Sequence, residues 1–422
     1  MLKVLHTADW HLGQSFFGFD RDYEHSRFLD WLLLELRSQQ PDGLLIAGDV
    51  FDTINPSATA QRRYYNFLAN AHAACPKLQI VIVSGNHDAG ARLEAPSELL
   101  ESLNISVVGT VRRFENGDID YEKFLVPLKA NDGTVQAMAI AVPFLRPSDV
   151  PLLPSASDPY LDGIRELYRR ATQAARQRRD QLCPAGALIA MGHCHLQGAA
   201  ESPDSERRLV IGGAEALDDK AFEDDIAYVA LGHLHRAQDF SNGRVRYCGS
   251  PIPLSFAEIR YAHQVLSLTF DGSKLTSVTS IPVQQTASLV TLPSFGSARV
   301  RDVLDQILAW PTSAELSPQD YPFLEVRVLE DGPDPTRRQQ IEEALDGKPL
   351  RLASIKVERR AQVLEPMSND DQSEHRPDSV DLKSMSPEDV FLSAFQEKYG
   401  TSADDSLIRA FREVLLQEGP SS

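Results

Sequence analysis

Cysteine is scarce in this sequence, and its spacing excludes two common uses of the residue. Four cysteines occur in 422 residues, and no two of them form a C-x-x-C pair (Cys75, Cys183, Cys194, Cys248). This spacing argues against a disulfide framework or a structural zinc site and is typical of a reducing compartment. No apolar run reaches the roughly 18 residues that a membrane span needs. We therefore expect a cytoplasmic protein with no membrane segment, and no leader peptide because Met1–His6 leads directly into strand-like sequence.

Positive charge is also in short supply. Lysine and arginine number 42 against 60 aspartate and glutamate residues, which gives a formal net charge of −18. Because attraction to DNA through the whole-molecule field needs a basic surface, any DNA contact would depend on local basic patches, bound metal or another subunit. The sequence also lacks a G-x-x-x-x-G-K-[ST] or G-x-G-x-x-G stretch. Any dependence on ATP would therefore come from another chain.

Short apolar runs alternate with helical patterns from residue 1 to about 285. Seven apolar runs are expected as strands because they are short and bounded by turn or charged residues: Lys3–His6, Gly43–Ala47, Gln79–Val83, Ala137–Val142, Ala187–Met191, Ala227–Leu231 and Val265–Phe270. Helices are expected at Arg21–Gln39, Tyr160–Leu182 and Pro56–Ala73, the last with Asn55 as its N-cap. This alternation predicts βαβ units in an α/β fold with a largely parallel or mixed sheet.

The remaining sequence divides into three parts. Residues 286–365 have the pattern of a small α+β unit, with a strand, a helix and a strand (Phe323–Val328, Pro335–Leu345, Leu350–Val357). Residues 366–385 are polar and acidic, which predicts a flexible linker. Residues 386–419 carry two amphipathic helical patterns that are too short to bury a core alone. They suit a docking element for a partner protein, and packing back onto the same chain is the alternative.

Potential metal ligands directly follow the strand-like runs. Four runs end in glycine followed at once by such a residue: Gly48-Asp49, Gly85-Asn86, Gly192-His193 and Gly232-His233. Glycine lets the backbone turn sharply and approach an ion closely, and residues beyond the carboxyl ends of strands line the crevice of an α/β sheet. We therefore expect seven side chains to converge at one sheet edge: Asp9, His11, Asp49, Asn86, His193, His233 and His235.

This set of donors predicts a particular chemistry. Oxygen and nitrogen ligands without sulfur suit two divalent ions of the manganese, iron or zinc type, and a carboxylate such as Asp49 can bridge the pair. Two ions about 3.5–4 Å apart can bind the attacking and leaving oxygens of a displacement at phosphorus, and metal-bound hydroxide is the natural nucleophile. His87 is placed to stabilise or protonate the leaving oxygen, and Asp88 to orient His87.

The motifs resemble those of the calcineurin-like metallophosphoesterases. The matching segments are Asp9-x-His11, Gly48-Asp49-x-x-Asp52, Gly85-Asn86-His87-Asp88, Gly192-His193 and Gly232-His233-x-His235. Longer segments are similar to DNA nucleases of this family: Thr7–Gly13, Gly48–Asp52 and Gly249–Phe256. The resemblance covers residues 1–285 and implies a β-sandwich flanked by helices, which would be the nuclease domain. Residues 286–365 would then be a cap that grips DNA.

The resemblance also implies an activity and partners. The activity would be Mn²⁺-dependent cleavage of DNA, as a 3′→5′ exonuclease on double strands and an endonuclease on single strands and hairpins. The processes served would be DNA repair, recombination and replication. The partner would be an ABC-type ATPase subunit with a long coiled coil. The chain would form a homodimer within a heterotetramer and associate with the nucleoid when acting.

Ligands for two ions follow from the same resemblance. One ion would be held by Asp9, His11, Asp49 and His235, and the other by Asp49, Asn86, His193 and His233, with His87 acting on the leaving group. His195 is a second histidine beside an expected ligand, and the chain alone does not decide between it and His193. We prefer His193 because it follows the glycine at the strand end.

Two other functions compete with a nuclease. The same two-metal chemistry would serve a phosphoprotein phosphatase, a cyclic-nucleotide phosphodiesterase or a nucleotide pyrophosphatase, and a fold does not choose among these. A non-catalytic scaffold with a structural metal site is the second alternative. The small unit and the tethered helical segment, which a small-molecule phosphatase does not need, favour the nuclease. The complete ligand set together with His87 favours an enzyme.

Overall fold

The computed structural model describes residues 1–153, 156, 158–202, 216–312, 316–330 and 334–359. The linker expected at 366–385 and the docking segment expected at 386–419 lie outside these residues. Met1–Arg360 pack as one unit. This grouping marks no division near residue 285, and the domain boundary that we expected between residues 285 and 286 stays a prediction.

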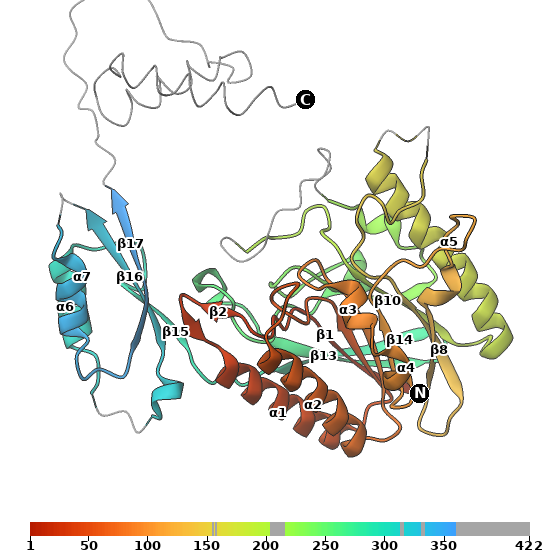
Figure 1. The fold of residues 1–422 in the computed structure, drawn as a ribbon, viewed down its shortest axis with the longest axis horizontal. Helices are drawn as coiled ribbons and strands as arrows, with labels where there is room; N and C mark the ends of the chain where they lie inside the picture. Colours follow the sequence, from red (N-terminus) through yellow and green to blue (C-terminus); the bar gives the residue numbers. More distant parts are fainter. Residues whose placement is uncertain (154–155, 157, 203–215, 313–315, 331–333, 360–422) are drawn as a thin grey trace, which may run out of the picture. The chain divides into compact units, whose positions relative to one another are not determined.

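The first sheet has six strands and contains the amino-terminal βαβ units (Figure 1). Its strands are β1 (Leu2–Thr7), β4 (Gly43–Ala47), β5 (Gln79–Val83), β6 (Ile105–Val108), β13 (Gln264–Asp271) and β14 (Lys274–Pro282). They follow the order β14-β13-β1-β4-β5-β6. Strands β1, β4, β5 and β6 are parallel, β13 pairs antiparallel with β1, and β14 pairs antiparallel with β13. The carboxyl ends of the four parallel strands therefore lie at one edge of the sheet.

A second sheet of six strands packs against the first. Its strands are β7 (Leu125–Lys129), β8 (Val135–Ala141), β9 (Ala187–His193), β10 (Ile226–Gly232), β11 (Gln238–Phe240) and β12 (Val245–Tyr247). They follow the order β11-β12-β10-β9-β8-β7, with four parallel strands in the centre and one antiparallel strand at each edge.

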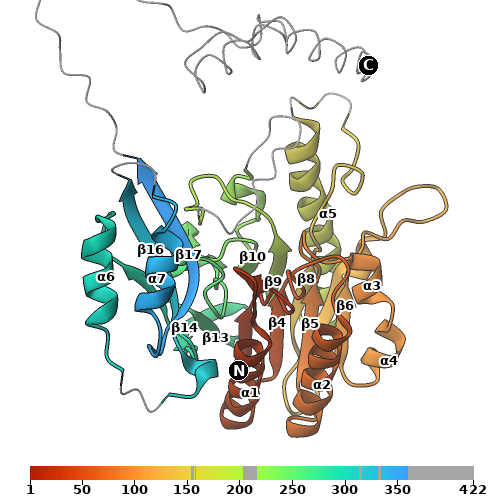
Figure 2. The ribbon, with the colours of Figure 1, turned by 60° about the vertical axis from the view of Figure 1, so that its left-hand side comes forward.

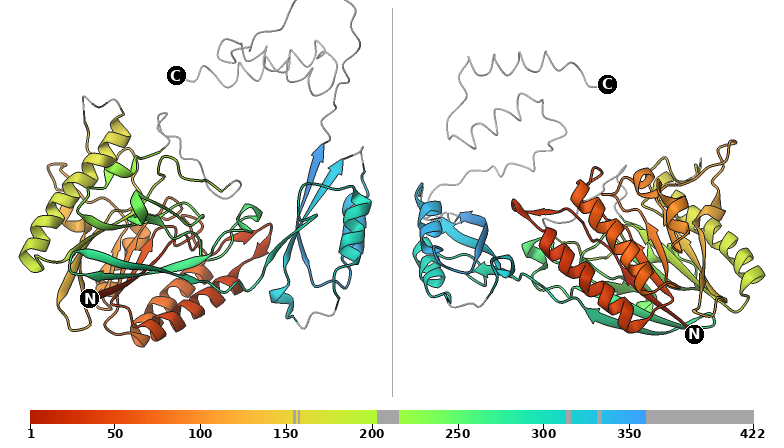
Figure 3. Two further views of the ribbon diagram at one scale, coloured as in Figure 1. Left: turned by 180° about the vertical axis from the view of Figure 1, so that it is seen from behind. Right: turned by 60° about the horizontal axis from the view of Figure 1, so that its bottom comes forward.

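Helices cover the outer faces of both sheets. The three long ones are α1 (Asp22–Gln39), α2 (Ala58–Ala74) and α5 (Pro159–Leu182). The strand period of two sorts the side chains of β4 into two cores: Leu45 and Ala47 lie between the sheets, whereas Leu44 and Ile46 lie beneath α1 and α2. Figure 2 shows α5 beside β8, and α1 and α2 lie side by side (Figure 3). The sandwich flanked by helices is confirmed.

The start of α2 differs from the sequence prediction. We expected Asn55 as the N-cap and Pro56 as the first helical residue, but the helix begins at Ala58. The Ser57 hydroxyl is the cap, since it accepts a hydrogen bond from the Ala60 N–H at 3.1 Å. A hydroxyl at this place satisfies one of the unpaired N–H groups of the first turn, so Pro56 lies before the helix.

Residues 286–359 contain a smaller sheet. Its elements in chain order are β15 (Leu289–Leu292), α6 (Val300–Leu308), β16 (Phe323–Glu330), α7 (Arg337–Ala344) and β17 (Arg351–Arg359). The three strands are parallel in the order β15-β16-β17, and each crossover contains a helix, as parallel pairing requires. The sequence pattern predicted β16, α7 and β17 but missed β15 and α6. Val303, Ile307, Val326 and Ile341 belong to a core of this unit.

Short elements complete the described chain. They are the hairpin β2 (Ser15–Phe16) and β3 (Phe19–Asp20), the helices α3 (Gly90–Glu94) and α4 (Ser97–Glu101), and the 3₁₀ turns Tyr121–Phe124, Asp219–Ala221, Ser241–Gly243, Phe256–Glu258 and Pro318–Asp320. Within the described residues, no helix combines the length and the apolar character that a membrane crossing requires.

Candidate metal centre

Both sheets deliver side chains to one place. The first sheet supplies Asp9 and His11 beyond β1, Asp49 beyond β4 and Asn86 beyond β5, and the second supplies His193, His233 and His235 at the ends of β9 and β10. The structure therefore brings together all seven residues that the sequence singled out.

One cluster consists of Asp9, His11 and His235, whose ligand atoms lie within 4.8 Å of one another. Asp9 Oδ1 accepts the His233 N–H at 2.9 Å. Asp9 Oδ2 and His11 Nε2 are buried without a hydrogen-bond partner among the described residues. Burying such atoms costs free energy unless something compensates. A cation would compensate both, so this cluster fits a metal ion.

Asp49 joins this cluster to a second one. Its Oδ2 lies 3.5 Å from His11 Nε2 and 3.3 Å from His193 Nε2. Asn86 Oδ1 in turn lies 2.9 Å from His193 Nε2 and 3.1 Å from His233 Nδ1. Oxygen and nitrogen atoms at these separations fit around a common divalent ion. One carboxylate thus faces both clusters.

Three of the histidines are anchored through Nδ1, which leaves Nε2 for the centre. His11 Nδ1 lies 3.2 Å from Asp52 Oδ1, His193 Nδ1 donates to the Ala47 carbonyl at 2.9 Å, and His235 Nδ1 donates to Glu258 Oε1 at 2.9 Å. Histidines that bind metal commonly donate their other ring N–H to a carboxylate or a carbonyl in this way. The anchors support a metal-binding role for these rings.

The backbone around the centre adopts a sparsely populated conformation. Four expected ligands have positive φ: Asp9 (54°), His11 (47°), Asp49 (47°) and His233 (101°). Non-glycine residues rarely adopt this region, and when they do they cluster at functional sites. Gly48, with φ of 90°, also leaves room for the His193 ring, since a Cβ there would collide with it. The local fold therefore serves the placement of these side chains.

His87 lies beside the centre and is partly exposed. Its backbone N–H donates to Asp49 Oδ1 at 2.9 Å, and its Nδ1 donates to the Asp52 carbonyl at 2.7 Å. The ring centroid lies 4.8 Å from that of His11. His87 can therefore present Nε2 to a substrate oxygen held at the centre.

No hydrogen bond joins the Asp88 carboxylate to the His87 ring in the described part of the chain. The carboxylate accepts the N–H groups of Val50 at 3.1 Å, Phe51 at 2.9 Å and Gly85 at 2.9 Å. We expected Asp88 to orient His87, and this expectation is wrong because the backbone of the β4 and β5 loops takes up the carboxylate. Asp88 ties these two loops together instead.

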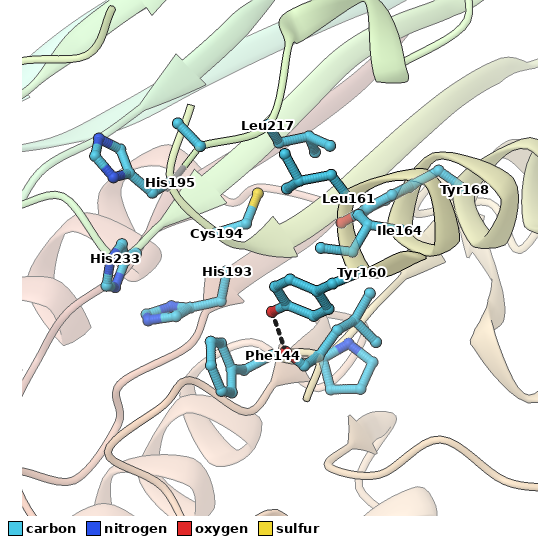
Figure 4. A pocket seen from close by; sticks show the side chains of 13 residues that line it. Phe144, Tyr160, Leu161, Ile164, Tyr168, His193, Cys194, His195, Leu217 and His233 are labelled. Carbon is cyan, nitrogen blue, oxygen red and sulfur yellow. Dashed lines mark hydrogen bonds between the residues drawn. The ribbon is translucent and has the colours of Figure 1, made fainter. Parts of the chain in front are cut away.

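The structure separates His193 from His195. His193 lies against Asp49 and Asn86, whereas His195 Nε2 lies 3.7 Å from Glu201 Oε1. Apolar side chains of α5, Leu161 and Ile164 among them, line a pocket beside His193 (Figure 4). This pocket gives the centre one apolar wall.

Charge at the centre favours a bound cation. Burial raises the pKa of Asp9 to about 7. Burial also acts to raise the pKa of Asp49, but the neighbouring histidines, His193 first, hold it well below its usual range. Burial lowers the pKa of His193, and the charge of Asp49 more than reverses this and raises it to about 9. A proton on His193 thus compensates Asp49, as a metal ion would.

Burial disfavours the charged form of two further histidines of the centre. It lowers the pKa of both His11 and His233. A neutral imidazole is the form that binds metal. Sequence reasoning gave no role to Asp52 and Glu258, which hold His11 and His235. Asp52 stood in a quoted motif, but Glu258 lies 23 residues beyond His235 and had no local signal.

A family model described as calcineurin-like phosphoesterase matches residues 2–237, and one described as type 5 capsule protein repressor C-terminal domain matches residues 287–399. The fold is that of a calcineurin-like phosphoesterase. A relative from Rhodobacter capsulatus, named as the D subunit of nuclease SbcCD, is 38% identical over 93% of this chain and 94% of its own. A relative of the same name from Escherichia coli K12 is 31% identical over 92% of this chain and 94% of its own.

This chain therefore belongs to the family of SbcCD nuclease D subunits. The family resemblance expected from the motifs is confirmed. Among solved structures, a dimetal phosphatase from Danio rerio is similar at a TM-score of 0.34 and 13% identity, over 67% of this chain and 99% of that one.

Proposed function

We propose that this protein is a metal-dependent DNA nuclease, the D subunit of an SbcCD-type complex. It hydrolyses phosphodiester bonds as a 3′→5′ exonuclease on double strands and as an endonuclease on single strands and hairpins. The observation that carries the proposal is the position of Asp49 Oδ2, which lies 3.5 Å from His11 Nε2 on one side of the centre and 3.3 Å from His193 Nε2 on the other. Relatives over nearly the whole chain are named as the D subunit of nuclease SbcCD, which favours DNA over a small phosphoester as substrate.

Two divalent ions are part of the proposal, and Mn²⁺ is the metal we expect. Asp9, His11, Asp49 and His235 would hold one ion, and Asp49, Asn86, His193 and His233 the other. Asp9 Oδ2 and His11 Nε2 are buried and have no hydrogen-bond partner among the described residues, which supports this assignment. When bound, such ions supply Lewis acidity and a water of lowered pKa.

The chain's own groups would perform the remaining steps. Asp49 Oδ1 accepts the His87 N–H. This hydrogen bond fixes the position of the loop after β5, which carries His87, relative to the loop after β4, which carries Asp49. The Asp52 carbonyl holds His87 Nδ1–H, so Nε2 faces the leaving oxygen and could stabilise or protonate it when the ring is in its imidazolium form, which carries hydrogen on both nitrogens. Asp88 keeps the β4 and β5 loops in register through three backbone N–H groups.

We further propose an SbcC-type ABC ATPase as partner, with this chain as a homodimer inside a heterotetramer. The absence of a nucleotide-binding motif in this sequence supports a separate ATPase chain. Residues 286–365 would cap the DNA, 366–385 would be the linker, and 386–419 would dock the ATPase. The complex would work in the cytoplasm at the nucleoid, in repair, recombination and replication.

Cleavage of an end-labelled DNA hairpin tests the proposal. The purified chain is assayed with Mn²⁺, Mg²⁺ or EDTA, with and without the ATPase partner and ATP. We expect Mn²⁺-dependent cutting that the partner stimulates. Turnover of p-nitrophenyl phosphate or a small phosphodiester with no cutting of DNA would reject the nuclease and leave a small-substrate phosphoesterase.

A further inference from the structure

Glu258 is a wholly buried carboxylate in the 3₁₀ turn Phe256–Glu258, with 0% of its surface exposed. Its Oε1 accepts the His235 Nδ1–H at 2.9 Å. Its Oε2 accepts hydrogen bonds from Ser250 Oγ at 3.2 Å and from the Leu254 N–H at 2.9 Å. A buried carboxylate is costly unless donors compensate it. The segment is therefore built to keep this charge in contact with His235.

The contact decides which nitrogen of His235 carries hydrogen. An ionised carboxylate can only accept, so the hydrogen lies on Nδ1 and the lone pair lies on Nε2. A metal ion binds the nitrogen that has the lone pair. His235 shares its cluster with Asp9 and His11, so Glu258 prepares His235 to complete that cluster.

The segment around Glu258 is held in place from two directions. Arg21, itself buried, donates to the Pro253 carbonyl at 2.9 Å, and its guanidinium lies 5.0 Å from the centroid of the Phe16 ring. His263 Nδ1 donates to the Ser250 carbonyl at 2.9 Å. Because both anchors are buried, the carboxylate has a fixed position rather than a choice of rotamers in solvent.

We propose that Glu258 is a positioning residue for the ion position formed by Asp9, His11 and His235. It sets the orientation and the tautomer of His235 and touches neither DNA nor the reacting atoms. The proposal deepens the proposed function, on which its chemistry rests. His11 has a comparable partner in Asp52, but the Asp52 side chain is 28% exposed, so water can replace that contact more readily.

Glu258→Gln is the test, with Glu325→Gln as the matched control. In Glu258→Gln the amide has a single acceptor oxygen where the carboxylate has two. Its NH₂ group must therefore face either His235 Nδ1–H or the Leu254 N–H, and one of these two hydrogen bonds is lost. Glu325 is also 0% exposed, and it pairs with Arg327 and Lys356 in the small sheet. Both variants thus lose a buried charge, but only one loses it beside His235. Mn²⁺ binding is measured by calorimetry without DNA, and melting temperatures are recorded.

We expect the wild-type chain to bind two ions and Glu258→Gln to weaken one of them by roughly 10–100-fold while the other keeps its affinity. Glu325→Gln should bind both ions as the wild type does, even if it melts earlier. Unchanged binding of both ions to Glu258→Gln, or equal weakening of both, would overturn the proposal. DNA cleavage is assayed separately, so a wild-type chain that binds two ions without cutting DNA rejects the nuclease and not the role of Glu258.

Discussion

Asp49 contacts three other residues of the centre. Its Oδ2 faces His11 Nε2 and His193 Nε2, and its Oδ1 accepts the His87 N–H. Its φ of 47° lies in the left-handed region, which non-glycine residues adopt in only a few per cent of cases and aspartate more readily than most. One carboxylate therefore links both clusters to the loop that carries His87.

Asp49→Asn should weaken the binding of both ions and lower metal-dependent cleavage by at least about 100-fold. The amide keeps the shape of the side chain but removes the negative charge and one acceptor. Calorimetric titration with Mn²⁺ and cleavage of single-stranded DNA measure the two effects. Loss of a single ion with the other at wild-type affinity would show that Asp49 does not bridge the clusters.

His87→Gln should lower kcat by about 10²–10⁴-fold, the usual contribution of a positioned proton donor, and leave both ions bound. The ring contacts the Asp52 carbonyl and lies beside His11, and its own nitrogens are absent from the ligand sets we propose. His72→Gln is the control, since His72 lies in the last turn of α2 and outside the centre, and it should keep wild-type kcat. Full activity of His87→Gln at saturating Mn²⁺ would remove the assigned role.

At the scale of elements, the convergence of the candidate ligands at the strand ends could be predicted because the signal is local. A short apolar run, a glycine and a ligand such as Asp49 or His193 stand together in the sequence, and parallel strands place their ends at one edge. Glu258 could not be predicted, because its role arises only when the turn after β12 folds back onto His235. The contact of Asp88 was predicted wrongly because the sequence does not reveal which backbone N–H groups are unpaired.

Gly48→Ala should disrupt the centre, whereas Gly133→Ala should not. Both glycines have φ near +90°, so both substitutions incur backbone strain of about 1–3 kcal/mol. A Cβ at Gly48 would also collide with the His193 ring, while a Cβ at Gly133 meets open space. Urea unfolding measures the strain and Mn²⁺ titration the centre. Equal effects of the two variants on metal binding would mean that the close approach at Gly48 does not matter.

At the scale of the whole molecule, the contact between the two sheets makes stability depend on pH. His6 of β1 and Tyr228 of β10 meet between the sheets, with His6 Nδ1 2.9 Å from the Tyr228 hydroxyl. Burial lowers the pKa of His6 to about 3. The unfolded chain takes up a proton near pH 6.5 and the folded chain does not, so the free energy of unfolding falls as pH drops from 6.5 toward 3.

In His6→Gln, the free energy of unfolding should therefore fall less steeply as the pH drops below 6.5. Each histidine of this kind contributes a slope of up to about 1.4 kcal/mol per pH unit. His25, which burial also holds at a pKa of about 3, keeps its share in the variant. Urea unfolding in EDTA between pH 4.5 and 7.5 gives the slopes for both chains. Parallel curves would show that His6 does not carry the acid sensitivity.

Removal of the residues after 365 tests how the chain divides its tasks. Met1–Arg360 pack as one unit that contains both sheets, the centre and the small sheet, so a chain ending at residue 365 should keep Mn²⁺-dependent cleavage of single-stranded DNA. It should no longer co-purify with the ATPase partner, because residues 386–419 are the docking segment that we propose. The full-length chain, expressed with the same partner, is the control. If the truncated chain unfolds or no longer cuts DNA, the residues after 365 are part of the folded nuclease. If it still binds the ATPase, the docking surface lies within residues 1–365.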